Sequence, residues 1–107
     1  GHPWERCKAF RESALFSDFV SFRDIKNLSL KLYKNGELVQ NSGYDLMIFK
    51  PENVIKECDE IFGIDDYDIL MSGTPKGVGS FEKGDILRGE ILEEGGVIVS
   101  KEWICNF

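Results

Sequence analysis

The sequence predicts a mainly β fold with a single α-helix, and three patterns support this. Apolar residues alternate around an Asn-Gly pair in residues 28–40, which is typical of a β-hairpin. Apolar residues recur with a helical period in residues 51–62. Two further apolar stretches, residues 86–92 and 97–103, flank a Gly-Gly pair and predict two more strands. Residues 1–27 show no clean period, and we expect them to be mostly irregular or extended.

The first hairpin is the clearest of the predicted elements. Leu28, Leu30 and Leu32 alternate with other residues before Asn35-Gly36, and a second run follows in residues 37–40. Asn-Gly is favoured in two-residue hairpin turns because both residues tolerate a positive φ. We therefore expect two antiparallel strands joined by a tight primed turn.

The predicted helix has a clear start and a clear end. Pro51 suits the first helical position, and the neighbouring Glu52 favours the positive end of the helix dipole. Gly63 then ends the run. We expect a helix of about three turns, with an apolar face that covers one side of the sheet. The residues on that face are Val54, Ile55, Cys58, Ile61 and Phe62.

A glycine-rich loop follows the acidic turn at residues 65–68 and the strand-like apolar run Ile69–Met71. Its glycines allow backbone amides to approach a ligand closely, and Pro75 fixes φ just after Thr74. A hydroxyl presented among backbone amides is suited to a small anion such as a carboxylate or phosphate. The alternative is a turn-rich loop that only joins two strands.

The loop does not match the common nucleotide-binding motifs. A P-loop needs its lysine after the second glycine, whereas Lys76 precedes Gly77. A dinucleotide-binding loop would need a small residue where Glu82 stands.

Composition and charge limit the classes of function. At 107 residues the chain is expected to form one domain. The net charge of -6 argues against non-specific binding to nucleic acid or an anionic membrane. No apolar run reaches the roughly 18 residues of a membrane-spanning helix. Cys7, Cys58 and Cys105 are odd in number and far apart, so we expect reduced thiols in a cytoplasmic protein.

Lys8 is a second candidate for chemistry, because it lies between Cys7 and Phe10, close to Trp4. A lysine among apolar groups can act as an electrostatic or proton-transfer group. The alternative, favoured by composition alone, is a surface lysine whose stem covers apolar groups.

The chain resembles the fumarylacetoacetate hydrolase family in four segments, in the same order along the sequence. These are Trp4–Phe10 (W-x-x-x-K-x-F), residues 28–40 (a hairpin ending in NGE-x-x-Q), residues 45–49 (D-M-I-F) and Ile69–Asp85 (GTPxGVG followed by GD). They span nearly the whole chain, and the last is the most specific. The resemblance implies a mixed β-sandwich or β-roll like the C-terminal part of that family's catalytic domain.

The resemblance also implies an activity. Members include acylpyruvases, 2-hydroxyhepta-2,4-diene-1,7-dioate isomerases and some oxaloacetate tautomerases. They share a divalent metal, usually Mg²⁺ or Mn²⁺, that chelates a 2-oxo acid and acts as a Lewis acid. By this resemblance, Lys8 lies beside the metal site as a catalytic residue, and Thr74 with Gly73 holds the substrate's carboxylate. The expected function is acylpyruvase-like hydrolysis of a carbon–carbon bond, or isomerisation.

Some departures from the family pattern limit what can be transferred. The family's metal ligands, two glutamates and an aspartate, precede the W-x-x-x-K-x-F segment, where this chain begins. We therefore expect residues 1–107 to be one domain, the C-terminal portion without its metal-binding half, and to be inactive alone. Arg11 and Tyr44 replace an aspartate and a threonine or serine that are frequent in the family.

Two expectations about partners follow. A β-roll without its other half exposes apolar surface, so we expect self-association as a homo-oligomer such as a homodimer. The alternative to the enzyme is a small, non-catalytic β module. It would bind a carboxylate or phosphate ligand, or a protein partner, through the glycine-rich loop.

Overall fold

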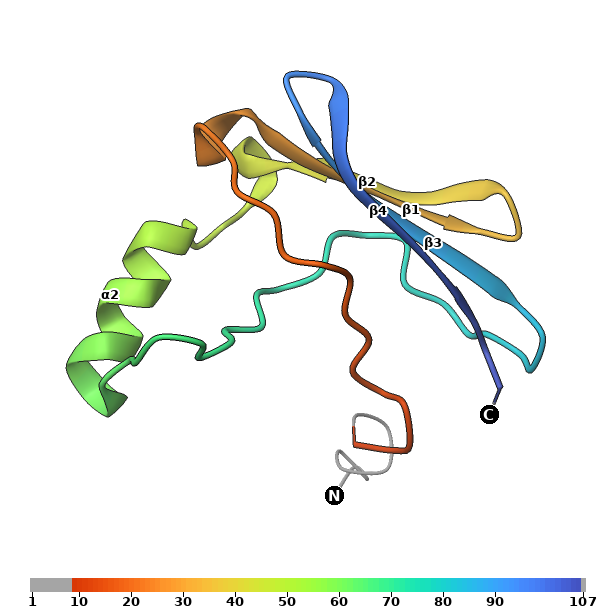
Figure 1. Ribbon diagram of the computed structural model, residues 1–107, viewed down its shortest axis with the longest axis horizontal. Coiled ribbons are helices and arrows are strands. Elements are labelled where there is room, and N and C mark those ends of the chain that lie inside the picture. The colour runs from red at the N-terminus through yellow and green to blue at the C-terminus, as the bar shows by residue number, and fades with distance from the viewer. Residues whose placement is uncertain (1–8, 107) are drawn as a thin grey trace.

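The computed structural model describes residues 9–106, and in them a four-stranded antiparallel sheet is accompanied by one α-helix (Figure 1). The strand order is β2-β1-β3-β4. The prediction of a mainly β fold with one α-helix is confirmed. The strands are β1 (Leu28–Lys34), β2 (Glu37–Gly43), β3 (Ile86–Glu93) and β4 (Gly96–Ile104), the helix is α2 (Pro51–Phe62), and 3-10 turns occupy Ile25–Asn27 and Tyr44–Leu46.

Both predicted hairpins form, the first with its turn as predicted and the second with its turn shifted by one residue. In the β1–β2 turn, Asn35 and Gly36 have φ values of 51° and 83°, as a primed turn requires. In the β3–β4 turn, the positive φ values belong to Glu94 and Gly95. The turn is therefore one residue earlier than the predicted Gly95-Gly96 pair, because Gly96 already pairs with Glu93 in the ladder.

The alternation of residues along the strands gives the sheet one apolar face. Leu30 lies opposite Ile91, and Ile91 lies opposite Val99, so these side chains share a face across three strands. On the other face, the Arg88 guanidinium lies 4.4 Å from the centre of the Tyr33 ring. The apolar face is the one that the two longest irregular segments approach.

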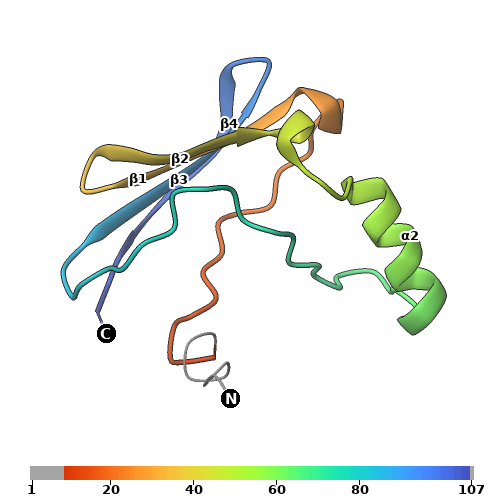
Figure 2. The same cartoon turned by 180° about the vertical axis from the view of Figure 1, so that it is seen from behind.

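The helix begins and ends as predicted, but its expected position was wrong. Gly63, with a φ of 71°, ends it. Figures 1 and 2 show that α2 stands beside the sheet and does not cover either face. On α2, Ile61 and Phe62 are 71% and 81% exposed. The physical reason is that irregular segments from residues 9–27 and 69–84 occupy the space in front of the apolar face (Figure 2).

The strand-like run Ile69–Met71 is another correction. It is irregular in the structure, and Met71 is 73% exposed. An extended segment becomes a strand only when a neighbour satisfies its backbone hydrogen bonds, and no described strand pairs with it.

The core of the described part of the chain is small. Leu92 and Cys105 are the buried apolar residues within residues 9–106. Cys58 and Cys105 carry free thiols, whereas Cys7 lies outside the described residues. Burial raises the pKa of the Cys105 thiol, with the Asp85 carboxylate adding to the effect. The helices in this part of the chain are too short or too polar to cross a membrane.

Candidate functional site

The glycine-rich loop lies directly against strand β2 at Gly77. Gly77 has a φ of 107°, and a Cβ added there would lie 2.0 Å from the backbone oxygen of Val39. Only glycine fits this combination of backbone angle and close approach. At Gly79, two residues later, an added Cβ would have no atom within 4 Å. The sequence therefore uses one particular glycine to bring the loop onto the sheet.

Gln40 holds the Thr74 part of the loop. This side chain in β2 is only 7% exposed, and its Nε2 lies 3.0 Å from both Thr74 Oγ1 and the Pro75 carbonyl oxygen. A carbonyl oxygen can only accept, so the Gln40 nitrogen must face Pro75. The second hydrogen of the same amide group then goes to Thr74 Oγ1.

This arrangement determines what Thr74 can do. Its hydroxyl oxygen accepts from Gln40, and a hydroxyl has one proton of its own to donate. The Thr74 residue is exposed. Thr74 is therefore oriented by a buried partner while its proton remains available for an external acceptor, as the binding of an oxyanion requires.

A cavity of about 280 Å³ lies beside the loop. Gly73 and Pro75, the neighbours of Thr74, line it together with Ser72, while Thr74 stands at its edge and is not among the lining residues. The sheet contributes Leu30 and Ile91 to the opposite wall. The remaining lining residues are Ile25, Leu28, Ser29, Ser42, Gly43, Tyr44, Met47 and Pro51.

Tyr44 is fixed in the wall of this cavity by two charged neighbours. Its hydroxyl donates to the Glu52 carboxylate at the start of α2. That hydrogen bond, followed by desolvation, raises the pKa of Tyr44 to about 12. The same hydrogen bond, followed by one from the backbone, lowers the pKa of Glu52. The Lys50 ammonium lies 4.6 Å from the centre of the Tyr44 ring and donates to the Tyr44 backbone oxygen.

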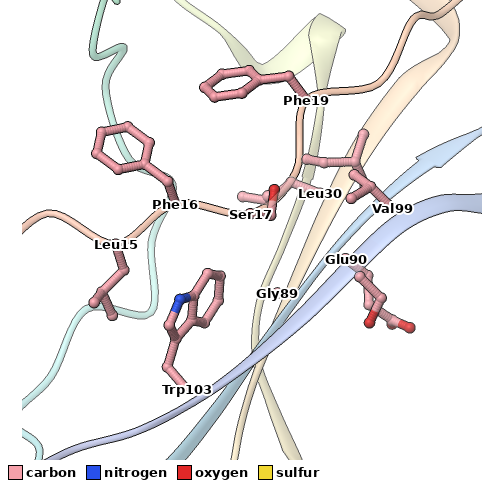
Figure 3. A pocket seen from close by; sticks show the side chains of 11 residues that line it. Leu15, Phe16, Ser17, Phe19, Leu30, Gly89, Glu90, Val99 and Trp103 are labelled. Atoms are coloured by element: carbon pink, nitrogen blue, oxygen red, sulfur yellow. The ribbon is translucent and has the colours of Figure 1, made fainter.

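A second cavity, of about 200 Å³, lies further along the same face of the sheet (Figure 3). Leu15 and Phe16 approach from the N-terminal segment, and the Trp103 indole from β4. A Cβ at Gly89 would lie 3.3 Å from the Trp103 ring, so this glycine makes room for the indole. Leu30 and Ile91 line both cavities.

The other end of the loop is anchored at Asp85. Its Oδ1 accepts from Asn35 Nδ2 at 3.0 Å, and its Oδ2 accepts from the Glu82 backbone N–H at 2.7 Å. The Lys34 ammonium lies 3.6 Å from Oδ2. These hydrogen bonds, the one from Asn35 first, hold the pKa of Asp85 below its ordinary value.

The structure brings together some of the residues that the sequence singled out. Gly73 lines the first cavity and Thr74 stands at its edge, whereas Lys8 lies outside the described residues. Gln40 was missed as a site residue. Its place in the NGE-x-x-Q segment, as an amide at the apolar end of a predicted strand, was the available indication.

The described residues do not form a metal centre by themselves. Within residues 9–106, no three His, Cys, Asp or Glu side chains come close enough to share an ion. The Mg²⁺ or Mn²⁺ that the family resemblance implies therefore does not fit this part of the chain alone, and we derive no catalytic step through it.

Comparison with known proteins places this geometry in a family. The model of the C-terminal fumarylacetoacetate (FAA) hydrolase domain matches residues 1–101. The chain is 37% identical to the mitochondrial oxaloacetate tautomerase FAHD1 of Bos taurus, over 85% of this chain and 42% of that protein. It is 36% identical to the oxaloacetate tautomerase YcgM of Escherichia coli, over 81% of this chain and 42% of that protein.

Solved structures give the same result. A fumarylacetoacetate isomerase/hydrolase described as putative, from Oleispira antarctica, is 31% identical with a TM-score of 0.79, over 97% of this chain and 49% of that one. The 2-hydroxyhepta-2,4-diene-1,7-dioate isomerase of Mycobacterium marinum is 28% identical with a TM-score of 0.65, over 76% of this chain and 31% of that one. The chain spans 42% of the length of both curated relatives named above. It belongs to the fumarylacetoacetate hydrolase family of hydrolases and isomerases, and corresponds to the C-terminal domain of that family.

Proposed function

We propose that this chain carries the carboxylate-binding part of an enzyme that acts on a 2-oxo acid. The observation that carries the proposal is the Gln40–Thr74 arrangement. A buried amide fixes the Thr74 oxygen and leaves the hydroxyl proton for an anion. Gly73 lines the cavity next to Thr74, and we expect the backbone amides of this part of the loop to supply further donors.

The remaining parts of the catalytic site are also proposals. Lys8, by the family resemblance, would stand beside the metal site as an electrostatic or proton-transfer group. A Mg²⁺ or Mn²⁺ ion, when bound, would supply Lewis-acid chemistry. Its ligands would have to come from outside residues 9–106.

The type of reaction follows from the relatives. Those named above are oxaloacetate tautomerases, and one structural neighbour is a 2-hydroxyhepta-2,4-diene-1,7-dioate isomerase. Their names support a proton shift next to the 2-oxo group. Acylpyruvase-like hydrolysis of a carbon–carbon bond is the second candidate, because it requires the same bound 2-oxo carboxylate.

We further propose a homo-oligomeric, cytoplasmic protein. Exposed apolar side chains on α2 and along residues 15–22 support self-association. The free thiols Cys58 and Cys105 fit a reducing compartment. Because some relatives are described as mitochondrial, cell fractionation is the deciding measurement for the compartment.

The main test compares Thr74→Ala with Thr74→Ser in the full-length protein encoded by this gene. The assay uses oxaloacetate and short acylpyruvates, with and without Mg²⁺. Loss of a hydrogen bond to a charged group should raise KM for every active substrate by roughly 10-fold in Thr74→Ala. The serine variant should largely retain the parent KM, because it keeps the hydroxyl.

Two outcomes would contradict the proposal. Unchanged kinetics in Thr74→Ala would remove Thr74 from the site. Absence of both turnover and binding for the entire 2-oxo acid panel would favour the non-catalytic β module.

A further inference from the structure

The first cavity has an unusual composition for a site beside a carboxylate-binding loop. Its described walls are formed mainly by hydrocarbon from Leu28, Leu30, Met47, Pro75 and Ile91. Its lining contains no lysine, arginine or histidine among the residues the structure describes. A carboxylate placed in it would lose its hydration without gaining a cation, whereas an alkyl group would gain by leaving water.

Among the described residues that line the cavity, Tyr44 carries the one ionisable group, and that group is held neutral. Its proton is donated to Glu52, and its pKa is raised to about 12. Glu52 itself places negative charge at the hydroxyl end of the ring, which further disfavours an anion next to Tyr44. The Lys50 ammonium is engaged with the Tyr44 ring and with backbone oxygens of Tyr44 and Asp45.

Three parts of Tyr44 are held in place: its backbone, its hydroxyl and its ring. Its backbone follows β2 directly, its hydroxyl is tied to the first turn of α2, and its ring is covered by the Lys50 ammonium. The ring is thus a preformed wall and not a side chain that swings freely. Ser42 and Gly73 line the same cavity, so this wall and the part of the loop next to Thr74 share one space.

We propose that this cavity receives the part of the 2-oxo acid remote from its carboxylate, and that Tyr44 makes it select a short apolar acyl group over a second carboxylate. The inference rests on the proposed function, because Thr74 and the loop around it must hold the first carboxylate. It assigns substrate specificity to this chain, with Tyr44 as the specificity-determining residue. It also predicts a preference that differs from the substrate in the names of the curated relatives.

The first measurement uses the unchanged full-length protein with Mg²⁺. We expect kcat/KM for acylpyruvates with two- to four-carbon acyl groups to exceed kcat/KM for oxaloacetate by roughly 10-fold or more, because the described residues give this pocket apolar walls. Equal or better turnover of oxaloacetate would overturn the inference. This measurement does not depend on the folding of any variant.

The second measurement compares Tyr44→Thr, Tyr44→Phe and a matched Tyr33→Thr control. Removing the ring wall in Tyr44→Thr should reduce the acyl-over-oxaloacetate ratio by roughly 5- to 10-fold, mainly through KM for the acylpyruvate. Tyr44→Phe keeps the ring and should retain most of the ratio. Tyr33 packs against Arg88 on the other face of the sheet, so Tyr33→Thr should leave the ratio unchanged. An unchanged ratio in Tyr44→Thr would exclude Tyr44 as the selecting residue.

Pyruvate separates failure of this inference from failure of the proposed function. It has the 2-oxo carboxylate but only a methyl group in place of the acyl chain. Competitive inhibition by pyruvate together with no acyl preference would refute only the inference. No inhibition by pyruvate and no turnover of any 2-oxo acid would refute both.

Discussion

The two ends of the glycine-rich loop are held by the same hairpin but in different ways. At the Asp85 end, both carboxylate oxygens are engaged, by Asn35 and by the Glu82 backbone with Lys34 close by. At the Thr74 end, the buried Gln40 amide donates to the Thr74 hydroxyl and so orients it. The proton of that hydroxyl is not used in this bond. One end is saturated, and the other keeps hydrogen-bonding capacity for a ligand.

The contrast indicates a division of roles along one loop. The Asp85 end is also joined to the end of β4, since Gly84 N–H donates to the Cys105 oxygen and Cys105 N–H donates to the Asp85 oxygen. Such a closed set of bonds stabilises the fold. The Thr74 end has fewer bonds than it can make, which is typical of a binding site. Substitutions at the two ends should therefore affect different measurements.

The largest effect is expected from Gly77→Ala, which would separate the loop from β2. The added methyl group would collide with the Val39 backbone oxygen, and alanine would be strained at a φ of 107°. We expect a loss on the order of 3 kcal/mol in the free energy of unfolding of the full-length protein. Substrate binding should fall with it, because Gln40 and Thr74 would move apart.

Gly79→Ala is the matched control for this change. It adds the same methyl group two residues away, where nothing lies within 4 Å of the new Cβ. Chemical denaturation and kcat/KM should show this variant close to the parent protein. Equal losses in the two variants would show that loop flexibility, and not contact with β2, is what Gly77 provides.

A smaller effect is expected from Asp85→Asn, and it should appear in stability more than in substrate binding. The asparagine side chain has an NH2 group in place of one of the two acceptor oxygens. This group would face an N–H donor, from either Asn35 or the Glu82 backbone, and one hydrogen bond would be lost. Thermal unfolding should begin at a lower temperature. KM should change little in the folded fraction, because the Thr74 end keeps Gln40.

The same substitution has a pH dependence with a definite sign. The folded-state pKa of Asp85 is depressed below its ordinary value of 3.8, so its contribution to stability is present above that pH. It is lost as the pH falls from about 4 through the lower folded-state pKa. The difference in unfolding temperature between the parent and Asp85→Asn should therefore shrink on acidification. A difference that grows below pH 4 would contradict the anchoring role of this carboxylate.

Much of the fold could be predicted because its determinants are local. The Asn35-Gly36 turn, the start of α2 at Pro51 and its end at Gly63 depend on backbone preferences of the residues themselves. The position of α2 could not be predicted in this way. An apolar face on a helix indicates that another surface should cover it, but the sequence does not say which one. The described sheet does not cover the apolar face of α2.

The residues of the candidate site show the same difference between local and long-range determinants. Thr74 was found because Pro75 and the glycines around it form a local pattern. Gln40 was missed because its role depends on a contact between residues 34 positions apart in the sequence. The Tyr44–Glu52 bond also needed the structure, since it depends on how the 3-10 turn after β2 faces the helix.

The smallest effect in this comparison is expected from Lys34→Met. Lys34 Nζ donates to the Ser80 oxygen at 2.7 Å and lies 3.6 Å from Asp85, yet its side chain is 34% exposed. Exposed ion pairs contribute little, and methionine retains much of the apolar stem. Lys34→Met should therefore lower the unfolding temperature less than Asp85→Asn does. Adding about 0.5 M salt, which screens exposed charges, should bring the unfolding temperature of the parent protein closer to that of Lys34→Met. If Lys34→Met lowered the unfolding temperature more than Asp85→Asn, the hydrogen bond from Lys34 to the Ser80 oxygen, and not the Asp85 carboxylate, would be the main anchor of this end of the loop.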